Sequence, residues 1–301
     1  MQPNQFMPSR SCNVIDSSIG ILPSVVIEKH SRPAYPWFNH ALGCMLILFI
    51  LAGCKEKTYR VKTETLALSS LREVVALEDS LVKPVLYKNV AGFDSLSQAE
   101  AKDKFIAVLL PAILVAKHER ETDQLKFRLL LEEEKWDNED STLFNYLKER
   151  YQIRTVDHGF QRMQTYPNSL VLAQAAVETG WGKSRFFREA RNVFGIWSFN
   201  ENDVRVEAHS ARGNKKVFLR AYDDLSGSVR DYFDVLSRSN AYRGLRIMRD
   251  STEDPIQLLP YLSNYSERKG AYTRLLNKVI EQNGLRRYDN YRIHPDYLEA
   301  E

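Results

Sequence analysis

The stretch LAQAAVETGWGKS, residues 172–184, places a glutamate near the end of an otherwise apolar helix. Gly180 fits the left-handed residue that follows a last helical turn, so the pattern predicts a helix over residues 168–179. On such a helix Glu178 lies one turn after Gln174, on a stripe of small and apolar groups. A carboxylate in this position faces a neighbourhood that is poor in water.

Two effects disfavour the charged form of Glu178. Burial removes water from the carboxylate, and the C-terminus of a helix carries partial negative charge, so both raise its pKa. An acid that keeps its proton near neutral pH can protonate the leaving oxygen of a glycosidic bond. Trp181 is expected to add an apolar wall or a face for sugar stacking. The alternative reading is a solvated or capping glutamate.

Composition limits the class of protein and its partners. The chain has 301 residues and 44% hydrophobic content, enough for one sizeable domain and an appendage. Its 42 basic and 39 acidic residues nearly cancel, so nucleic acid is not an expected partner. The six histidines form no HExxH pair, and we expect neither a metal nor a cofactor. We expect a monomer.

An apolar run at residues 41–53 is too short to span a bilayer and predicts an export signal. It ends in Leu-Ala-Gly before Cys54, a pattern typical of the bacterial lipobox, in which the cysteine is lipidated. Residues 1–53 are therefore assigned to a lipoprotein leader, with a buried core segment as the alternative. Lys55 favours the outer membrane, facing the periplasm, over the inner membrane. Because the leader is long, we also expect translation to begin near Val25 or Val26.

Residues 54–164 read as a helical extension, since apolar residues recur at three- and four-residue steps from Tyr59 onward. Ser97 and Glu100 form a capping box that opens one of these helices, and Pro111 predicts a kink in it.

The part after residue 164 reads as a helical domain with one small β-lobe. Residues 203–222 alternate as two strands joined by a turn at residues 211–214, which predicts a hairpin. Further helices are expected at residues 183–190, 225–238, 254–262 and 266–282. Residues 286–301 are assigned to a C-terminal tail. The predicted fold class is thus mainly α.

The words AQAAVETGWGKSRF and, at residues 191–197, RNVFGIW resemble glycoside hydrolase family 73, the bacterial β-N-acetylglucosaminidases, and its Bax-type branch in particular. The likeness covers residues 165–285, and the later stretch YSERKGAYTRLL belongs to it. Thr179 and Val193 depart from the family pattern by conservative changes. The resemblance implies a lysozyme-like fold that hydrolyses the β-1,4 bond after N-acetylglucosamine in the glycan strands of peptidoglycan.

The resemblance also implies roles for single residues. Glu178 matches the catalytic acid, and Glu207 on the first strand of the hairpin matches the second carboxylate. Glu201 and Asp203 compete for that second role, and Glu207 can also be an exposed strand residue. Tyr265 matches a tyrosine that lines the sugar site, with a core or capping tyrosine as the alternative. The remaining residues expected to shape the floor of the cleft are Asn192, Phe194 and Gly195, with an ordinary core residue as the alternative for Phe194.

The distance between the two carboxylates decides the mechanism and is not readable from sequence. A separation of about 6.5–9.5 Å favours inversion and about 5 Å a covalent intermediate. A wider gap favours attack by the 2-acetamido group of the substrate, the route we expect. The rival functions are a lytic transglycosylase, an amidase that cuts the peptide stem, and a wall-binding lipoprotein without activity.

Overall fold

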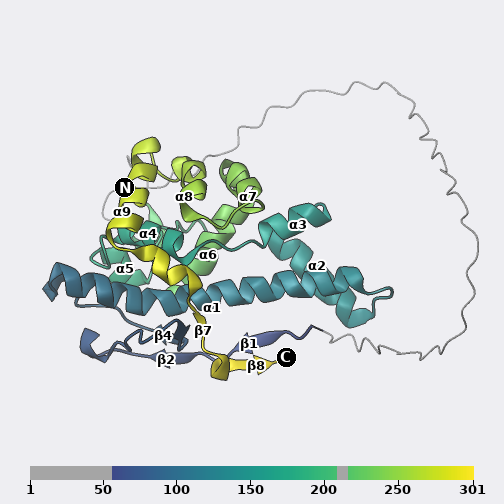
Figure 1. Cartoon of the computed structure of the whole chain (residues 1–301), viewed down its shortest axis with the longest axis horizontal. Helices are drawn as coiled ribbons and strands as arrows, with labels where there is room; N and C mark the ends of the chain where they lie inside the picture. The colour runs from purple at the N-terminus through teal and green to yellow at the C-terminus, as the bar shows by residue number, and fades with distance from the viewer. Residues whose placement is uncertain (1–55, 209–215) are drawn as a thin grey trace, which may run out of the picture. The chain divides into compact units, whose positions relative to one another are not determined.

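The computed structural model describes residues 56–208 and 216–301, and its architecture is mainly helical, as the sequence predicted (Figure 1). The predicted leader, the lipidation site Cys54 and the predicted turn at residues 211–214 lie outside the described residues. Among the described helices, none combines the length and the apolar character that crossing a bilayer requires.

Helices and short strands follow one another in one compact unit from Lys57 onward. The helices are α1 Gln98–Glu132, α2 Asn138–Tyr151, α3 Val156–Arg162, α4 Asn168–Thr179, α5 Arg185–Ala190, α6 Leu225–Arg238, α7 Arg243–Arg249, α8 Pro255–Leu258 and α9 Gly270–Gln282. The strands are β1 Tyr59–Val61, β2 Glu64–Leu66, β3 Leu81–Val82, β4 Val85–Tyr87, β5 Arg205–Glu207, β6 Phe218–Arg220, β7 Arg292–Ile293 and β8 Leu298–Ala300.

Helix α1 runs along the whole unit and contacts both α4 and α6 (Figure 1). It begins at the predicted capping box: the Ser97 N–H donates to Glu100 Oε2 over 3.1 Å, and the Glu100 N–H donates to Ser97 Oγ over 3.3 Å. Pro111 lies inside the helix and does not end it. Buried side chains of α1, α4, α6 and α9 share one hydrophobic core. The extension and the domain that follows it therefore pack on the same core.

The first part of the extension is not helical, which corrects the prediction for residues 59–96. The chain there forms β1 to β4 and two short 3₁₀ turns. Strand β1 pairs antiparallel with β8, and β3 pairs parallel with β7. The apolar residues of this segment are buried in the core at the three- and four-residue steps that suggested a helix. They lie mostly in extended chain that packs against α1. Pairing with strands more than 200 positions away leaves no signal in local periodicity.

The predicted tail, residues 286–301, is an ordered part of this arrangement. It supplies β7 and β8 and ends with an ion pair of 2.5 Å between Lys126 Nζ of α1 and Glu301. The 3₁₀ segment η5, Leu285–Asn290, contacts α4. There the Asn168 side chain donates to the Tyr288 carbonyl over 2.7 Å. The chain end thus fixes the start of the helix that holds Glu178.

Helix α4 matches its predicted bounds, and its ends have the expected chemistry. Gly180 is left-handed at φ 58° and its N–H bonds to the Ala176 carbonyl. Nearly every side chain of α4 is buried, so the helix is a central element of the core. Gly182 follows at φ 84°, and a Cβ there would lie 3.0 Å from the ring of Phe93.

The β-lobe also follows the prediction. Strands β5 and β6 form an antiparallel hairpin in which Glu207 lies opposite Phe218. Helix α6 has its predicted bounds, and α8 begins at Pro255, where the sequence places a first helical residue. The short helix α7, between α6 and α8, was not predicted.

Replacing Gly182 with alanine is expected to destabilise the protein more than replacing Gly180. Both changes put a Cβ on a left-handed residue, at about 1–2 kcal/mol. At Gly180 nothing lies within 4 Å of the new carbon, whereas at Gly182 Phe93 must move. Overpacking of this kind adds about 1–3 kcal/mol. Equilibrium unfolding in urea measures both losses, and equal losses would contradict this account.

Candidate active site

Glu178 lies in the last turn of α4, where it is partly buried between the core and the surface. Burial raises the pKa of its carboxyl to about 7, and a hydrogen bond from Tyr272 opposes this rise. The predicted direction is confirmed, and burial is its main cause. Near neutral pH a large share of the molecules therefore keeps the proton on Glu178.

A chain of three hydrogen bonds runs through the core and ends at Glu178, and each residue in it donates to the next. The Tyr232 hydroxyl donates to Gln174 Oε1. Gln174 Nε2 donates to the Tyr272 hydroxyl over 3.0 Å, and Tyr272 donates to Glu178 Oε1 over 2.9 Å. Tyr272, Gln174 and Tyr232 are at most 1% exposed. Because Tyr272 already accepts from Gln174, its own proton is directed to Oε1, which leaves Oε2 to bear the acidic proton.

Tyr272 stays protonated in this position. Burial, and then the neighbouring Glu178, raise the pKa of its hydroxyl well above the ordinary value. The hydroxyl therefore remains a donor to Glu178 over the whole range in which Glu178 titrates. A donor to the charged form stabilises the carboxylate that remains after the proton has left.

An aromatic layer supports this chain. The ring of Tyr265 stacks on Tyr272 at 5.8 Å between centroids and 9° between planes. Phe194 stacks on Tyr232 at 4.1 Å, and the Tyr265 hydroxyl donates to the Phe194 carbonyl over 3.2 Å. Tyr265 is 2% exposed and Phe194 is 0% exposed. Tyr265 and Phe194 are therefore core side chains behind the hydrogen-bond chain, and they do not form an open sugar-binding surface.

Asn192 and Gly195 shape the loop that ends in the β-lobe. The Asn192 side chain donates to the carbonyls of Ile196 and Arg220 over 2.9 and 2.8 Å and accepts from the Ile196 N–H over 2.9 Å. These bonds hold the loop against β6. Gly195 has φ 67°, a conformation that favours glycine. Asn192 therefore acts here by fixing the backbone.

Trp181 faces α1. Its ring meets Phe105 edge to face at 5.6 Å, and Lys102 Nζ lies 5.2 Å from the ring centroid. The residue is left-handed at φ 59°. These contacts hold the turn after α4 against α1, so this side of the Trp181 ring packs on α1.

Glu178 and Glu207, the expected second carboxylate, lie in different environments. The Glu207 side chain is 48% exposed on β5 and forms an ion pair of 3.2 Å with Lys216. Of its competitors, Asp203 pairs with Arg220 Nε at 3.2 Å and accepts from Ser198 over 2.9 Å, while Glu201 is exposed. One carboxyl is thus held in the core and the others meet water.

The sequence did not reveal the three residues of the hydrogen-bond chain that ends at Glu178. Gln174 had a detectable signal, because an amide one turn before a buried acid on the same helix face needs a polar partner. Tyr272 lies 94 positions after Glu178 and Tyr232 lies 58 after Gln174. Their sequence positions on α9 and α6 only mark them as core residues.

A helical domain that keeps one carboxylic acid protonated at the edge of its core has the chemistry of a glycoside hydrolase. Residues 156–285 match the family described as mannosyl-glycoprotein endo-beta-N-acetylglucosaminidase. This part of the chain therefore matches the glucosaminidase family, in agreement with the resemblance seen in the sequence.

Individual proteins are similar to part of this chain. The peptidoglycan hydrolase FlgJ of Salmonella typhimurium is 28% identical over 127 residues, which are 38% of this chain and 39% of that protein. Protein bax of Escherichia coli is 26% identical, over 41% of this chain and 45% of that protein. A crystal structure of a peptidoglycan hydrolase from Sphingomonas sp. A1 is 27% identical, covering 44% of this chain and 86% of that one at a TM-score of 0.34. The chain thus spans about two fifths of the length of the curated relatives it matches.

Glu178→Gln is expected to stabilise the protein against unfolding, and increasingly so from pH 4.5 to pH 7. The unfolded chain releases this proton near the ordinary pKa of 4.5, whereas the folded protein keeps it up to about 7. Between these values the unfolded state binds fewer protons, so the free energy of unfolding of the wild type falls as pH rises. The gain levels off above pH 7, on the order of 3 kcal/mol.

Urea unfolding of both proteins at several pH values measures this difference. The matched control is Glu189→Gln, since the Glu189 side chain on α5 is 52% exposed. A stability difference for Glu178→Gln that does not depend on pH would contradict the burial of the acid.

Tyr272→Phe is expected to raise the pKa of Glu178 further. The change removes the donor to Oε1, and a hydrogen bond to a charged group contributes about 1.5–3 kcal/mol, so a rise on the order of one pH unit follows. NMR titration of the glutamate carboxyl carbons measures it. Tyr265→Phe is the matched control, because its hydroxyl donates to Phe194 and not to Glu178. Equal effects of the two variants would refute the direct role of Tyr272.

Proposed function

We propose that this protein is an endo-β-N-acetylglucosaminidase that hydrolyses the β-1,4 bond after N-acetylglucosamine in peptidoglycan. The observation that carries the proposal is the buried Glu178, with a pKa of about 7, inside a glucosaminidase-family domain. The relative FlgJ, named as a peptidoglycan hydrolase, supports the choice of substrate. Glycan strands are the partner, and the enzyme acts as a monomer without cofactor.

In the proposed reaction Glu178 is the general acid. Its Oε2 proton passes to the leaving glycosidic oxygen as the bond to the anomeric carbon breaks. The carboxylate that remains keeps the hydrogen bond from Tyr272, which strengthens as charge develops on Oε1. Gln174 keeps the tyrosine in the donating orientation.

The nucleophile in this proposal is the substrate's own 2-acetamido oxygen. It bonds to the anomeric carbon as the leaving group departs and closes a ring. Water then attacks the anomeric carbon while the Glu178 carboxylate takes a proton from it, and the bond between that carbon and the acetamido oxygen breaks, which restores the acetamido group. The exposed, ion-paired state of Glu207 favours this route over direct attack by the protein. Glu207, on the lobe, then stabilises the positive charge of the acetamido group.

We further propose that Cys54 is lipidated and that the enzyme faces the periplasm from the outer membrane. Support comes from the sequence, where an apolar run precedes Leu-Ala-Gly-Cys and Lys55 follows. A substrate in the cell wall requires export, which agrees with this leader.

Glu178→Gln is expected to lower the rate of wall digestion at least about 100-fold, because general acid catalysis contributes about 10²–10⁴. Binding to purified walls is expected to persist, since glutamine keeps the shape of the site. Turbidity clearing of isolated peptidoglycan measures the rate, with Glu189→Gln as the control. Clearing at the wild-type rate would overturn the role of Glu178.

The digestion products test the reaction type. Mass spectrometry is expected to find reducing N-acetylglucosamine ends. Anhydro-muramic ends would instead identify a lytic transglycosylase, and released peptide stems an amidase. Wall binding by the wild type without any product would leave only a binding function.

A further inference from the structure

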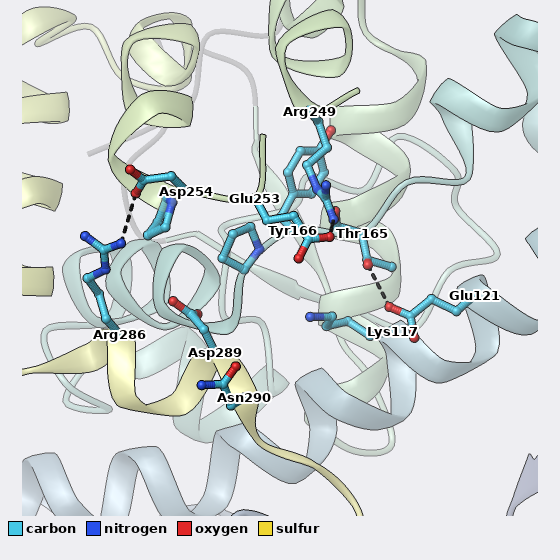
Figure 2. A pocket seen from close by; sticks show the side chains of 12 residues that line it. Lys117, Glu121, Thr165, Tyr166, Arg249, Glu253, Asp254, Arg286, Asp289 and Asn290 are labelled. Atoms are coloured by element: carbon cyan, nitrogen blue, oxygen red, sulfur yellow. Dashed lines mark hydrogen bonds and ion pairs between the residues drawn. The ribbon is translucent and has the colours of Figure 1, made fainter. Parts of the chain in front are cut away.

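A pocket of about 600 Å³ lies at the start of α4, at the opposite end of the helix from Glu178 (Figure 2). Its size falls in the range of small-ligand sites, about 300–1,000 Å³. Helix α1, the segment before α4, the end of α7, the start of α8 and η5 all contribute to its walls. The lining residues are Lys117, Glu121, Thr165, Tyr166, Pro167, Arg249, Glu253, Asp254, Pro255, Arg286, Asp289 and Asn290.

Most charges on the rim of the pocket are already compensated. Arg249 pairs with Glu253 at 2.8 Å, and Arg286 pairs with Asp254 at 3.3 Å. Glu121 accepts a hydrogen bond of 2.8 Å from Thr165. The lining residues carry three cations and four anions, so a ligand with a large net negative charge would gain little from this rim.

Lys117 is the cation that these pairs leave over. It reaches from α1 into the pocket (Figure 2). Its Nζ donates to the neutral amide oxygen of Asn168 over 3.0 Å. An ammonium group has three donors, so two N–H bonds remain beyond the one to Asn168. Burial lowers the pKa of this amine, while the charges of Glu121 and Asp289 oppose that effect.

Asp289 is the anion on the other side, where it projects from η5 toward the same space (Figure 2). Its carboxylate accepts from the Ser169 N–H over 2.7 Å and from the Ser169 hydroxyl over 2.8 Å. Each carboxylate oxygen keeps a further lone pair for another donor. No ion pair joins Lys117 to Asp289 among the interactions of the described residues.

We propose that this pocket binds a short peptide that carries one carboxylate and one ammonium group, with the carboxylate at Lys117 and the ammonium at Asp289. Such a ligand pairs with Lys117 and with Asp289 at the same time, and its own two charges cancel. The biological source rests on the proposed function, since the peptide branches of peptidoglycan present both groups. The pocket lies roughly 15 Å along α4 from Glu178, so one helix would hold a peptide branch and a glycan together.

Binding of trialanine to the full-length chain, followed by calorimetry, tests the proposal. Trialanine carries both groups, and N-acetyl-trialanine amide carries neither while keeping the peptide backbone. Trialanine is expected to bind at least about tenfold more tightly, because a hydrogen bond to a charged group contributes about 1.5–3 kcal/mol. Equal binding of the two peptides, or no binding of trialanine at millimolar concentration, would overturn the proposal.

Two variants assign the ends of the peptide. Lys117→Met is expected to weaken trialanine about tenfold and to leave the affinity for the C-terminally amidated peptide unchanged. Asp289→Asn is expected to weaken trialanine similarly, with no effect on the N-acetylated peptide. The matched control is Lys104→Met, because Lys104 also lies on α1 and donates to a neutral oxygen, the Val74 carbonyl at 3.4 Å.

Thermal unfolding checks that each variant is folded, and the capped peptides test the wild type without any substitution. Glu178→Gln is expected to bind trialanine as the wild type does. Loss of wall digestion in that variant with intact peptide binding supports both proposals. A wild type that digests walls but does not bind trialanine refutes the pocket alone, whereas peptide binding without digestion refutes the proposed function alone.

Discussion

The burial of one carboxyl group is the constraint on which the rest of the domain depends. Glu178 ends a helix whose other side chains are almost all in the core, so the neutral form of the acid is favoured up to about pH 7. An acid in such a place needs polar partners that are themselves buried. Three helices supply these partners. Tyr272 donates to Glu178, Gln174 donates to Tyr272, and Tyr232 donates to Gln174.

The remainder of the fold holds α4 in place at both ends. At its start, Asn168 and Ser169 bond to η5, which the final strands connect back to the first part of the chain. At its end, Gly180 turns the chain and Trp181 packs on Phe105 of α1. A shift of the helix at either end would break the bond between Tyr272 and Glu178, since hydrogen bonds tolerate only a few tenths of an ångström. The segments before and after the domain therefore help to position the acid.

The candidate site was predictable to different degrees. Glu178 was found because its helix, its glycine cap and its apolar stripe are all local features. Phe194 and Tyr265 were assigned to the sugar site, but the structure shows them at 0% and 2% exposure beneath it. A stretch of sequence marks a residue as belonging to the site region, but whether its ring faces the substrate or the core depends on packing between helices. Tyr272, quoted in the same stretch as Tyr265, is the tyrosine that contacts the acid.

The sequence by itself determined the bounds of α4 and α6, the start of α1 and the presence of two paired strands in the β-lobe, because capping boxes, glycine turns and periodic apolar residues act within a few positions. It also indicated the family and the raised pKa of Glu178. Only the tertiary structure decided that residues 59–96 are extended and that the chain end pairs with them. It likewise decided which hydroxyl meets Glu178 and brought Lys117 and Asp289 to one pocket. The physical reason is that strand pairing and buried hydrogen bonds join residues far apart in the chain, and local pattern does not encode which partners meet.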